Sequence, residues 1–315
     1  MSVKEYVEQI DKAIQAEDYP VLNDAIPQLT RWIHEQDHPR YIEFLNVVSV
    51  CLSRSPDQAH KKTAMDGFES STRQMIDRLT QKGEIGYIDS LNDISERLAA
   101  SPRDEHKMLA IQGFITAATY APEALKMQAS QRAARSISAV LKSAIADDDP
   151  ELLCDMVITL GTWCERGVEC HAYAEPLLEG TDHLMQSNAA TPMAGMLYKV
   201  KALEGFDSAI QHFPKGSALE QSAVEKLIEH SKNILAGTSP GSELGRKAIM
   251  SLSAHAHRLP EPERQVEVAQ FAHDRALLSG DANLQRMTAF ELQYLAPQKP
   301  PSRPGGGSPP QSHPS

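Results

Sequence analysis

The sequence predicts an all-α fold of antiparallel helix pairs, with about 13 or 14 helices followed by a C-terminal tail of different composition. Three observations predict this fold. Helix signals recur along the chain while β-hairpin signals are nearly absent, most prolines stand where a helix is expected to begin, and a segment of about 46 residues repeats. With 41% hydrophobic residues, the 315-residue chain can fill a core.

The first helix illustrates the signals used along the whole chain. Ser2 and Glu5 have the spacing of a capping box, in which each side chain satisfies a backbone N–H at the helix start. Apolar residues then follow at helical spacing through Ile14. The same reasoning predicts helices over residues 2–17, 20–36, 39–53, 56–82, 84–100, 102–120, 122–146, 150–166, 171–188, 192–211, 216–236, 240–259, 261–279 and 281–295.

Proline placement supports these boundaries, because proline fits the first turn of a helix and damages its interior. Pro27 and Pro176 are exceptions and indicate a kink or a shifted boundary. The prolines expected at helix starts are Pro20, Pro39, Pro56, Pro102, Pro122, Pro150, Pro192, Pro240 and Pro260.

The chain repeats itself between residues 41–68 and 87–114. Thirteen of these 28 positions are identical without a gap, at an offset of 46 residues, against roughly one or two expected from composition. The identical pairs include Ser55/Ser101, Pro56/Pro102, His60/His106, Gly67/Gly113 and Phe68/Phe114.

Weaker copies continue the repeat, since the prolines from Pro56 to Pro240 that lead each copy also have a mean spacing of 46 residues. A helix pair of this length cannot bury its apolar faces alone, so neighbouring pairs are expected to stack into an α-solenoid. A simple helical bundle with one recent duplication remains the alternative. Glycine inside a helix costs about 1 kcal/mol relative to alanine, which indicates close helix crossings at Gly67, Gly113, Gly161 and Gly205.

In period and pattern, residues 20–295 resemble the HEAT-like and armadillo-like α-solenoid superfamily, whose repeats hold roughly 40 to 47 residues. The Asp and Arg typical of the HEAT consensus are not clearly present, and no named family is indicated. The resemblance implies protein recognition through an extended curved surface.

Composition and charge exclude several classes of partner. The net charge of −11 disfavours nucleic acid and anionic membrane surfaces, and a HEAT-like DNA glycosylase would also need a basic track with aromatic side chains. No apolar run is long enough to span a bilayer, and the N-terminus lacks the pattern of a targeting segment. We therefore expect a cytoplasmic protein. Its four cysteines are expected to be reduced thiols.

The nearest approach to a metal site is the group of Cys164, Cys170 and His171. Five residues separate the two cysteines, whereas zinc sites use a closer pair together with a second pair elsewhere. We therefore predict no metal site there. A redox disulfide between these cysteines has no further support, while Cys51 and Cys154 lie in apolar runs and are expected in the core.

The twelve histidines form no recognisable catalytic or metal motif. His60 and His106, one turn into their helices, are expected to be solvated. His255 and His257 fall on different helical faces, and a single His-Glu dipeptide, His34-Glu35, disfavours an iron hydroxylase with repeated dipeptides. No phosphate-binding loop, nucleophile elbow or dinucleotide fingerprint is present. We therefore name no catalytic, cofactor-binding or metal-ligating residue.

The sequence thus predicts an α-helical repeat domain over residues 1–296 and a disordered Pro/Gly/Ser-rich tail over 297–315. The P-x-x-P pattern at 301–304 is more typical of a flexible terminus than of an SH3 ligand. The predicted function is a non-enzymatic adaptor or scaffold that binds a protein partner on a curved helical surface. The alternatives are a helical-repeat enzyme or metal- or ligand-binding protein with an unrecognised site near Cys164 or the repeated histidines, and a secreted effector acting on a host protein.

Overall fold

The structure, a computed structural model, describes residues 3–36, 39–166 and 171–295, which form fourteen α-helices and no strand. This confirms the all-α fold. The helices are α1 (Val3–Ala16), α2 (Tyr19–Gln36), α3 (Pro39–Leu52), α4 (Gln58–Asp77), α5 (Ile88–Ala99), α6 (Asp104–Thr119), α7 (Lys126–Ala146), α8 (Pro150–Arg166), α9 (His171–Gln186), α10 (Pro192–His212), α11 (Ala218–Gly237), α12 (Glu243–His255), α13 (Pro262–Ser279) and α14 (Ala282–Leu295).

Every helix predicted from the sequence is present, and the shifted boundaries have local causes. α4 begins at Gln58 rather than Pro56, because the Asp57 carboxylate caps it by accepting a hydrogen bond from the Ala59 N–H at 2.8 Å. α12 begins after Ser242, whose hydroxyl accepts from the Gly245 N–H. Pro27 and Pro176 lie inside α2 and α9, so these two prolines do not mark helix boundaries.

The chain divides into two compact units, residues 1–223 and residues 224–315, with the division inside α11. The expectation of one repeat domain over residues 1–296 stays a prediction. The predicted disordered tail, 297–315, lies outside the described residues. None of the described helices is both long and apolar enough to cross a membrane.

The first unit is built from helix pairs whose second helices also pack on one another. Successive helices contact each other, as in α3 with α4, α5 with α6 and α9 with α10. In addition α2 contacts α4, α4 contacts α6, α6 contacts α8, and α8 contacts α10. We call these five second helices the inner row. Helix pairs that pack in register in this way are the stacking that the 46-residue repeat predicts.

Three repeated glycines lie at close helix crossings, as expected. A Cβ added at Gly67 or Gly113 would fall closer than 3.0 Å to the hydroxyl of Ser49 or Ser95, on the first helix of the same pair. Gly205 meets Thr181 in the same manner and also lies 2.8 Å from Val157 Cγ1 of α8 by this measure. Such positions have room for a hydrogen atom only.

Gly161 differs from the other three repeated glycines, and the predicted close crossing is wrong there. The nearest atom to a Cβ at Gly161 would be the Ser208 hydroxyl oxygen, 4.0 Å away. This extra space forms part of a groove described below.

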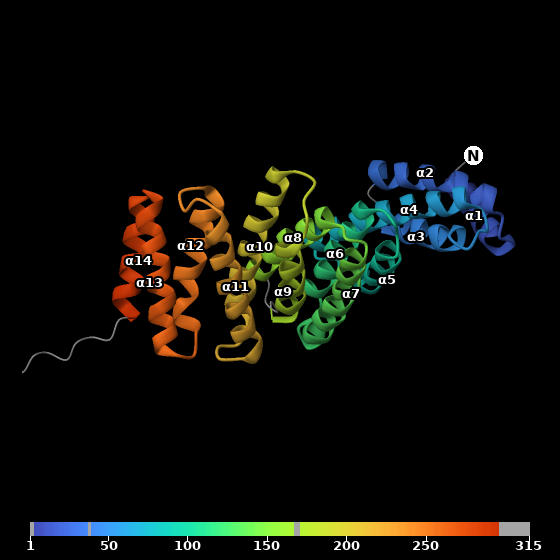
Figure 1. The fold of residues 1–315 in the computed structure, drawn as a ribbon. Coiled ribbons are helices and arrows are strands. Elements are labelled where there is room, and N and C mark those ends of the chain that lie inside the picture. The colour runs from blue at the N-terminus through green and yellow to red at the C-terminus, as the bar shows by residue number, and fades with distance from the viewer. Residues whose placement is uncertain (1–2, 37–38, 167–170, 296–315) are drawn as a thin grey trace, which may run out of the picture. The chain divides into compact units, whose positions relative to one another are not determined.

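The second unit contains the later part of α11 with α12, α13 and α14. Figure 1 shows α13 and α14 side by side as a hairpin, and α12 contacts both. Two ion pairs join α11 to α13: Glu225 with Arg264 at 2.7 Å, and Lys232 with Glu267 at 3.3 Å. Lys232 also lies over the Phe271 ring, 5.5 Å from its centroid.

Candidate functional site

The thiols of Cys51, Cys154 and Cys164 are buried, as the apolar runs around the first two predict. Burial is the main cause that raises the pKa of the Cys51 and Cys154 thiols, so both stay protonated and weakly nucleophilic. Cys170 and the side chain of His171 lie outside the described residues. Within the described ranges, no three His, Cys, Asp or Glu side chains gather as metal ligands.

The repeated histidines each bond to the repeated serine five residues earlier. Ser55 Oγ lies 2.8 Å from His60 Nδ1, and Ser101 Oγ lies 2.8 Å from His106 Nδ1. Each serine hydroxyl also accepts a backbone N–H two residues on, which fixes the turn that contains the proline. The expectation of solvated histidines is wrong for His106, which is only 1% exposed, because the serine and the neighbouring helix enclose it.

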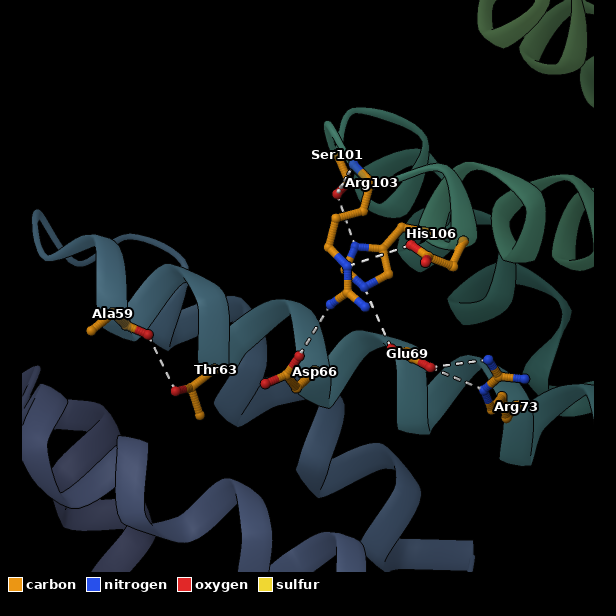
Figure 2. A network of polar contacts seen from close by, with 9 residues as sticks. Ala59, Thr63, Asp66, Glu69, Arg73, Ser101, Arg103 and His106 are labelled. Carbon is orange, nitrogen blue, oxygen red and sulfur yellow. Dashed lines mark hydrogen bonds and ion pairs between the residues drawn. The ribbon is translucent and has the colours of Figure 1, made fainter. Parts of the chain in front are cut away.

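His106 belongs to a polar network that joins α4 to α6 (Figure 2). Its Nε2 atom lies 3.4 Å from Glu69 Oε2 on α4. Arg103, in the turn before α6, lies 3.7 Å from Asp66 of α4, and Glu69 is also paired with Arg73 at 3.0 Å. The network therefore links one repeat to the next through the inner row.

A hydrolytic triad could be composed of the same residue types as Ser101, His106 and Glu69. Here the three side chains instead hold a turn and two helices together. A nucleophilic serine must be accessible and must face donors that stabilise an oxyanion. Ser101 is 6% exposed, and its hydroxyl is occupied by the Arg103 N–H and the His106 ring. The same serine–histidine contact recurs between Ser55 and His60, which indicates that it stabilises the turn in each repeat.

Burial gives His106 a pH dependence with a definite sign. Burial, followed by the charge of Arg103, lowers its pKa, while Glu69 and Asp66 oppose this shift. As the pH falls through about 6.5, this histidine is protonated in the unfolded chain before it is protonated in the folded chain. The free energy of unfolding therefore decreases as the pH falls. The pKa of Glu69 is also lowered, because burial, which alone would raise it, is outweighed by Arg73 and His106. This carboxylate contributes stability that is lost at lower pH.

We expect His106→Asn to flatten the pH dependence of stability between pH 7 and pH 5. Asparagine can keep a hydrogen bond to Ser101 without a group that titrates in this range. Urea unfolding at both pH values, followed by the fluorescence of Trp32 and Trp163, measures the difference. An unchanged loss of stability in the variant between the two pH values would contradict the role given to His106.

The remaining histidines of interest lie apart, as their spacing predicts. His255 is 4% exposed, whereas the His257 side chain is 45% exposed and lies 3.5 Å from Glu291 of α14. His34 Nδ1 lies 3.5 Å from Gln74 Nε2, which is a contact between α2 and α4. These side chains share no common centre.

A groove lies between α8 and α10, two parallel helices of the inner row. It has a volume of about 160 Å³. Ser208 of α10 crosses it by donating a hydrogen bond to the Gly161 carbonyl at 3.3 Å, which fixes the register of the two helices. The open space at Gly161 therefore belongs to this groove. Its lining residues are Val157, Ile158, Gly161, Thr162, Lys201, Glu204, Gly205 and Ser208.

An exposed apolar stripe on α10 precedes the groove residue Lys201. Met193 and Leu197 precede Lys201 at intervals of four residues, so the three side chains share one helical face. Met193 is 77% exposed and Leu197 is 47% exposed, while Ile158 on α8 is 42% exposed. We call the lining residues together with Met193 and Leu197 the α8–α10 groove.

α8, which forms one wall of the groove, carries two exposed acidic side chains, Glu151 and Asp155. Burial and then the carboxylate of Glu151 raise the pKa of the Tyr198 hydroxyl on α10, and Asp155 adds to the shift. Both carboxylates therefore lie close to α10, and both are exposed. Lys201 is paired with Glu204 at 2.8 Å, so its charge is locally balanced. Glu151 and Asp155 make the exposed surface of α8 near Tyr198 acidic.

Sequence reasoning did not find the α8–α10 groove, although one signal was present. Met193, Met196 and Leu197 are exposed apolar residues on one side of the first turns of α10, while the buried Tyr198 lies on another side, so apolar residues occupy more of the helix than its core face. An apolar segment wider than its core face indicates a surface that another molecule covers.

The sequence matches no protein-family model and no curated protein. Among solved structures, the chain is similar to one described as "Circular tandem repeat protein with novel repeat topology and enhanced subunit contact surfaces". The two are 14% identical, the match covers 92% of this chain and 81% of that chain, and the TM-score is 0.29.

Proposed function

We propose that this protein is a non-enzymatic helical-repeat scaffold whose α8–α10 groove binds a basic amphipathic helix of a partner protein. The observation that carries the proposal is the exposed apolar stripe of Met193 and Leu197 on α10, which leads to the groove residue Lys201 on the same helical face.

The apolar side chains supply the reason for a partner. A partner that fully buries one large aliphatic side chain gains about 1.5–3 kcal/mol of binding free energy from that side chain. Leucine and methionine at intervals of four residues, next to a shallow groove, are typical of a surface that receives the apolar face of a helix. Methionine adapts its shape to such a ligand.

The charges select the kind of helix. Glu151 and Asp155 are exposed acidic side chains of α8, and the charge of Glu204 is balanced by its ion pair with Lys201. The described part of α8 beside the groove therefore carries a net negative charge. A helix with lysine or arginine flanking its apolar face would be attracted, and an acidic helix would be repelled. The whole chain, at −11, adds a weaker long-range attraction of the same sign.

A synthetic helical peptide tests the proposal directly. The probe carries leucine at i, i+4 and i+7 with lysine on its flanks, and a second peptide replaces every lysine with glutamate. Binding is measured by fluorescence anisotropy. We expect the basic peptide to bind. Leu197→Ser is expected to lower the affinity for this peptide about tenfold, because the variant loses one central apolar contact. The exposed Ile85, on another part of the surface, supplies the matched variant Ile85→Ser, expected to bind as the wild type does.

Charge reversal separates the groove from net-charge attraction. The double variant Glu151→Lys with Asp155→Lys is expected to lower affinity about tenfold. Glu8→Lys with Asp11→Lys makes the same change of charge at exposed positions on α1. If the α1 variant weakens binding as much as the groove variant, the peptide recognises only the charge of the chain, and the groove is not its site.

A further inference from the structure

α14 carries an exposed stripe on the face turned away from α12 and α13. Leu284 and Thr288 are buried on its inner side, while Met287, Phe290 and Tyr294 are 39%, 71% and 75% exposed. These three residues follow one another at intervals of three and four, so they share one helical face. Such a face on a globular surface calls for a covering partner.

The charges of this face suit a second copy of the same chain. Arg286 is the exposed charged side chain of α14, and the one carboxylate of the helix, Glu291, is 22% exposed and lies 3.5 Å from His257. Two copies of a chain with net charge −11 repel one another over most of their surface. The apolar face of α14, whose most exposed charge is the cation Arg286 and whose one carboxylate is paired with His257, is where they can approach.

The spacing along α14 makes the face complementary to itself. Arg286 and Tyr294 each lie four residues from Phe290, in opposite directions, which is about 6 Å along the helix axis. When two copies of α14 pack antiparallel about a two-fold axis at Phe290, each Arg286 comes level with the other copy's Tyr294. The Arg286 N–H groups already bond to Asn283 and to the Ala282 carbonyl, which leaves the guanidinium plane for stacking on a ring.

We propose that the chain forms a two-fold symmetric dimer through α14, with Phe290 on the axis and Arg286 stacked on the ring of Tyr294 from the other copy. A single helix pair buries less surface than a standard interface, so the dimer is expected to dissociate in the micromolar range. This inference is independent of the α8–α10 groove.

Sedimentation equilibrium of the full chain, from micromolar to near-millimolar concentration, tests the dimer. We expect the wild type to pass from monomer to dimer, and Phe290→Asp to raise the dissociation constant at least about tenfold. Met250→Asp makes the same kind of change at an exposed apolar residue of α12 and is expected to dimerise as the wild type does. All these side chains are exposed, so circular dichroism should show unchanged helix content in each variant.

A second pair of variants tests the orientation. Arg286→Glu places a carboxylate against the ring of Tyr294 and is expected to weaken the dimer, whereas Arg246→Glu on α12 is not. A wild type that stays monomeric throughout, or a Phe290→Asp variant that dimerises as tightly as the wild type, would overturn the proposal. Equal weakening by both glutamate variants would show that general charge, and not this pairing, controls association.

Discussion

Replacing Gly205 with alanine is expected to lower the free energy of unfolding by about 2 kcal/mol, although alanine is the better helix former. The added Cβ would press on Thr181 of α9 and on Val157 of α8, each closer than 3.0 Å. Both neighbours are β-branched and have few rotamers with which to yield. Urea unfolding followed by tryptophan fluorescence measures the change, because Trp32 and Trp163 both lie in the first unit.

Gly161→Ala is the matched control, at the equivalent position of the preceding repeat. No atom lies closer than 4.0 Å to its added Cβ, so the gain in helix propensity is not opposed. We expect this variant to be more stable than the wild type by up to about 1 kcal/mol. Destabilisation of both variants to the same extent would mean that close packing does not explain the repeated glycines.

Replacing Phe114 with alanine is expected to cost about 3–5 kcal/mol, the largest effect predicted for this chain. Phe114 is fully buried, and so are its equivalents Phe68 and Phe206 in other repeats. The loss combines the transfer of an aromatic ring to water with the cavity that remains. The same fluorescence-monitored unfolding gives the value.

Met127→Ala is the control for this truncation, since Met127 on α7 is 64% exposed. Its free energy of unfolding should stay within about 0.5 kcal/mol of the wild type. A cost below about 1 kcal/mol for Phe114→Ala would show that the ring does not fill a packed core between repeats.

The fold was largely predictable because its signals are local. Caps, prolines and helical spacing indicated all fourteen helices, and the identity between residues 41–68 and 87–114 indicated that one unit recurs. Gly67 and Gly113 pointed to close crossings because glycine is costly in a helix unless packing requires it. The pairing of these glycines with Ser49 and Ser95 could not be predicted, since it depends on how two helices cross.

The candidate site was less predictable, because it depends on neighbours that are distant in sequence. His106 was expected in solvent from its first-turn position, yet Glu69 and Ser101 enclose it. The α8–α10 groove exists because a Cβ added at Gly161 would have open space around it, whereas one at Gly205 would meet Thr181 and Val157. The two glycines occupy the same position of the repeat, so the sequence gives no sign of this difference. Exposure of Leu197 likewise follows from packing and not from residue type.

Hydrogen–deuterium exchange with and without the basic amphipathic peptide tests the proposed recognition most directly. Saturating peptide is expected to slow exchange in α8 and α10, the two helices that form the groove. Exchange in α1 and α13 is expected to stay unchanged. Slowed exchange spread over the whole chain, or confined to helices other than α8 and α10, would contradict the assignment of this groove as the binding surface.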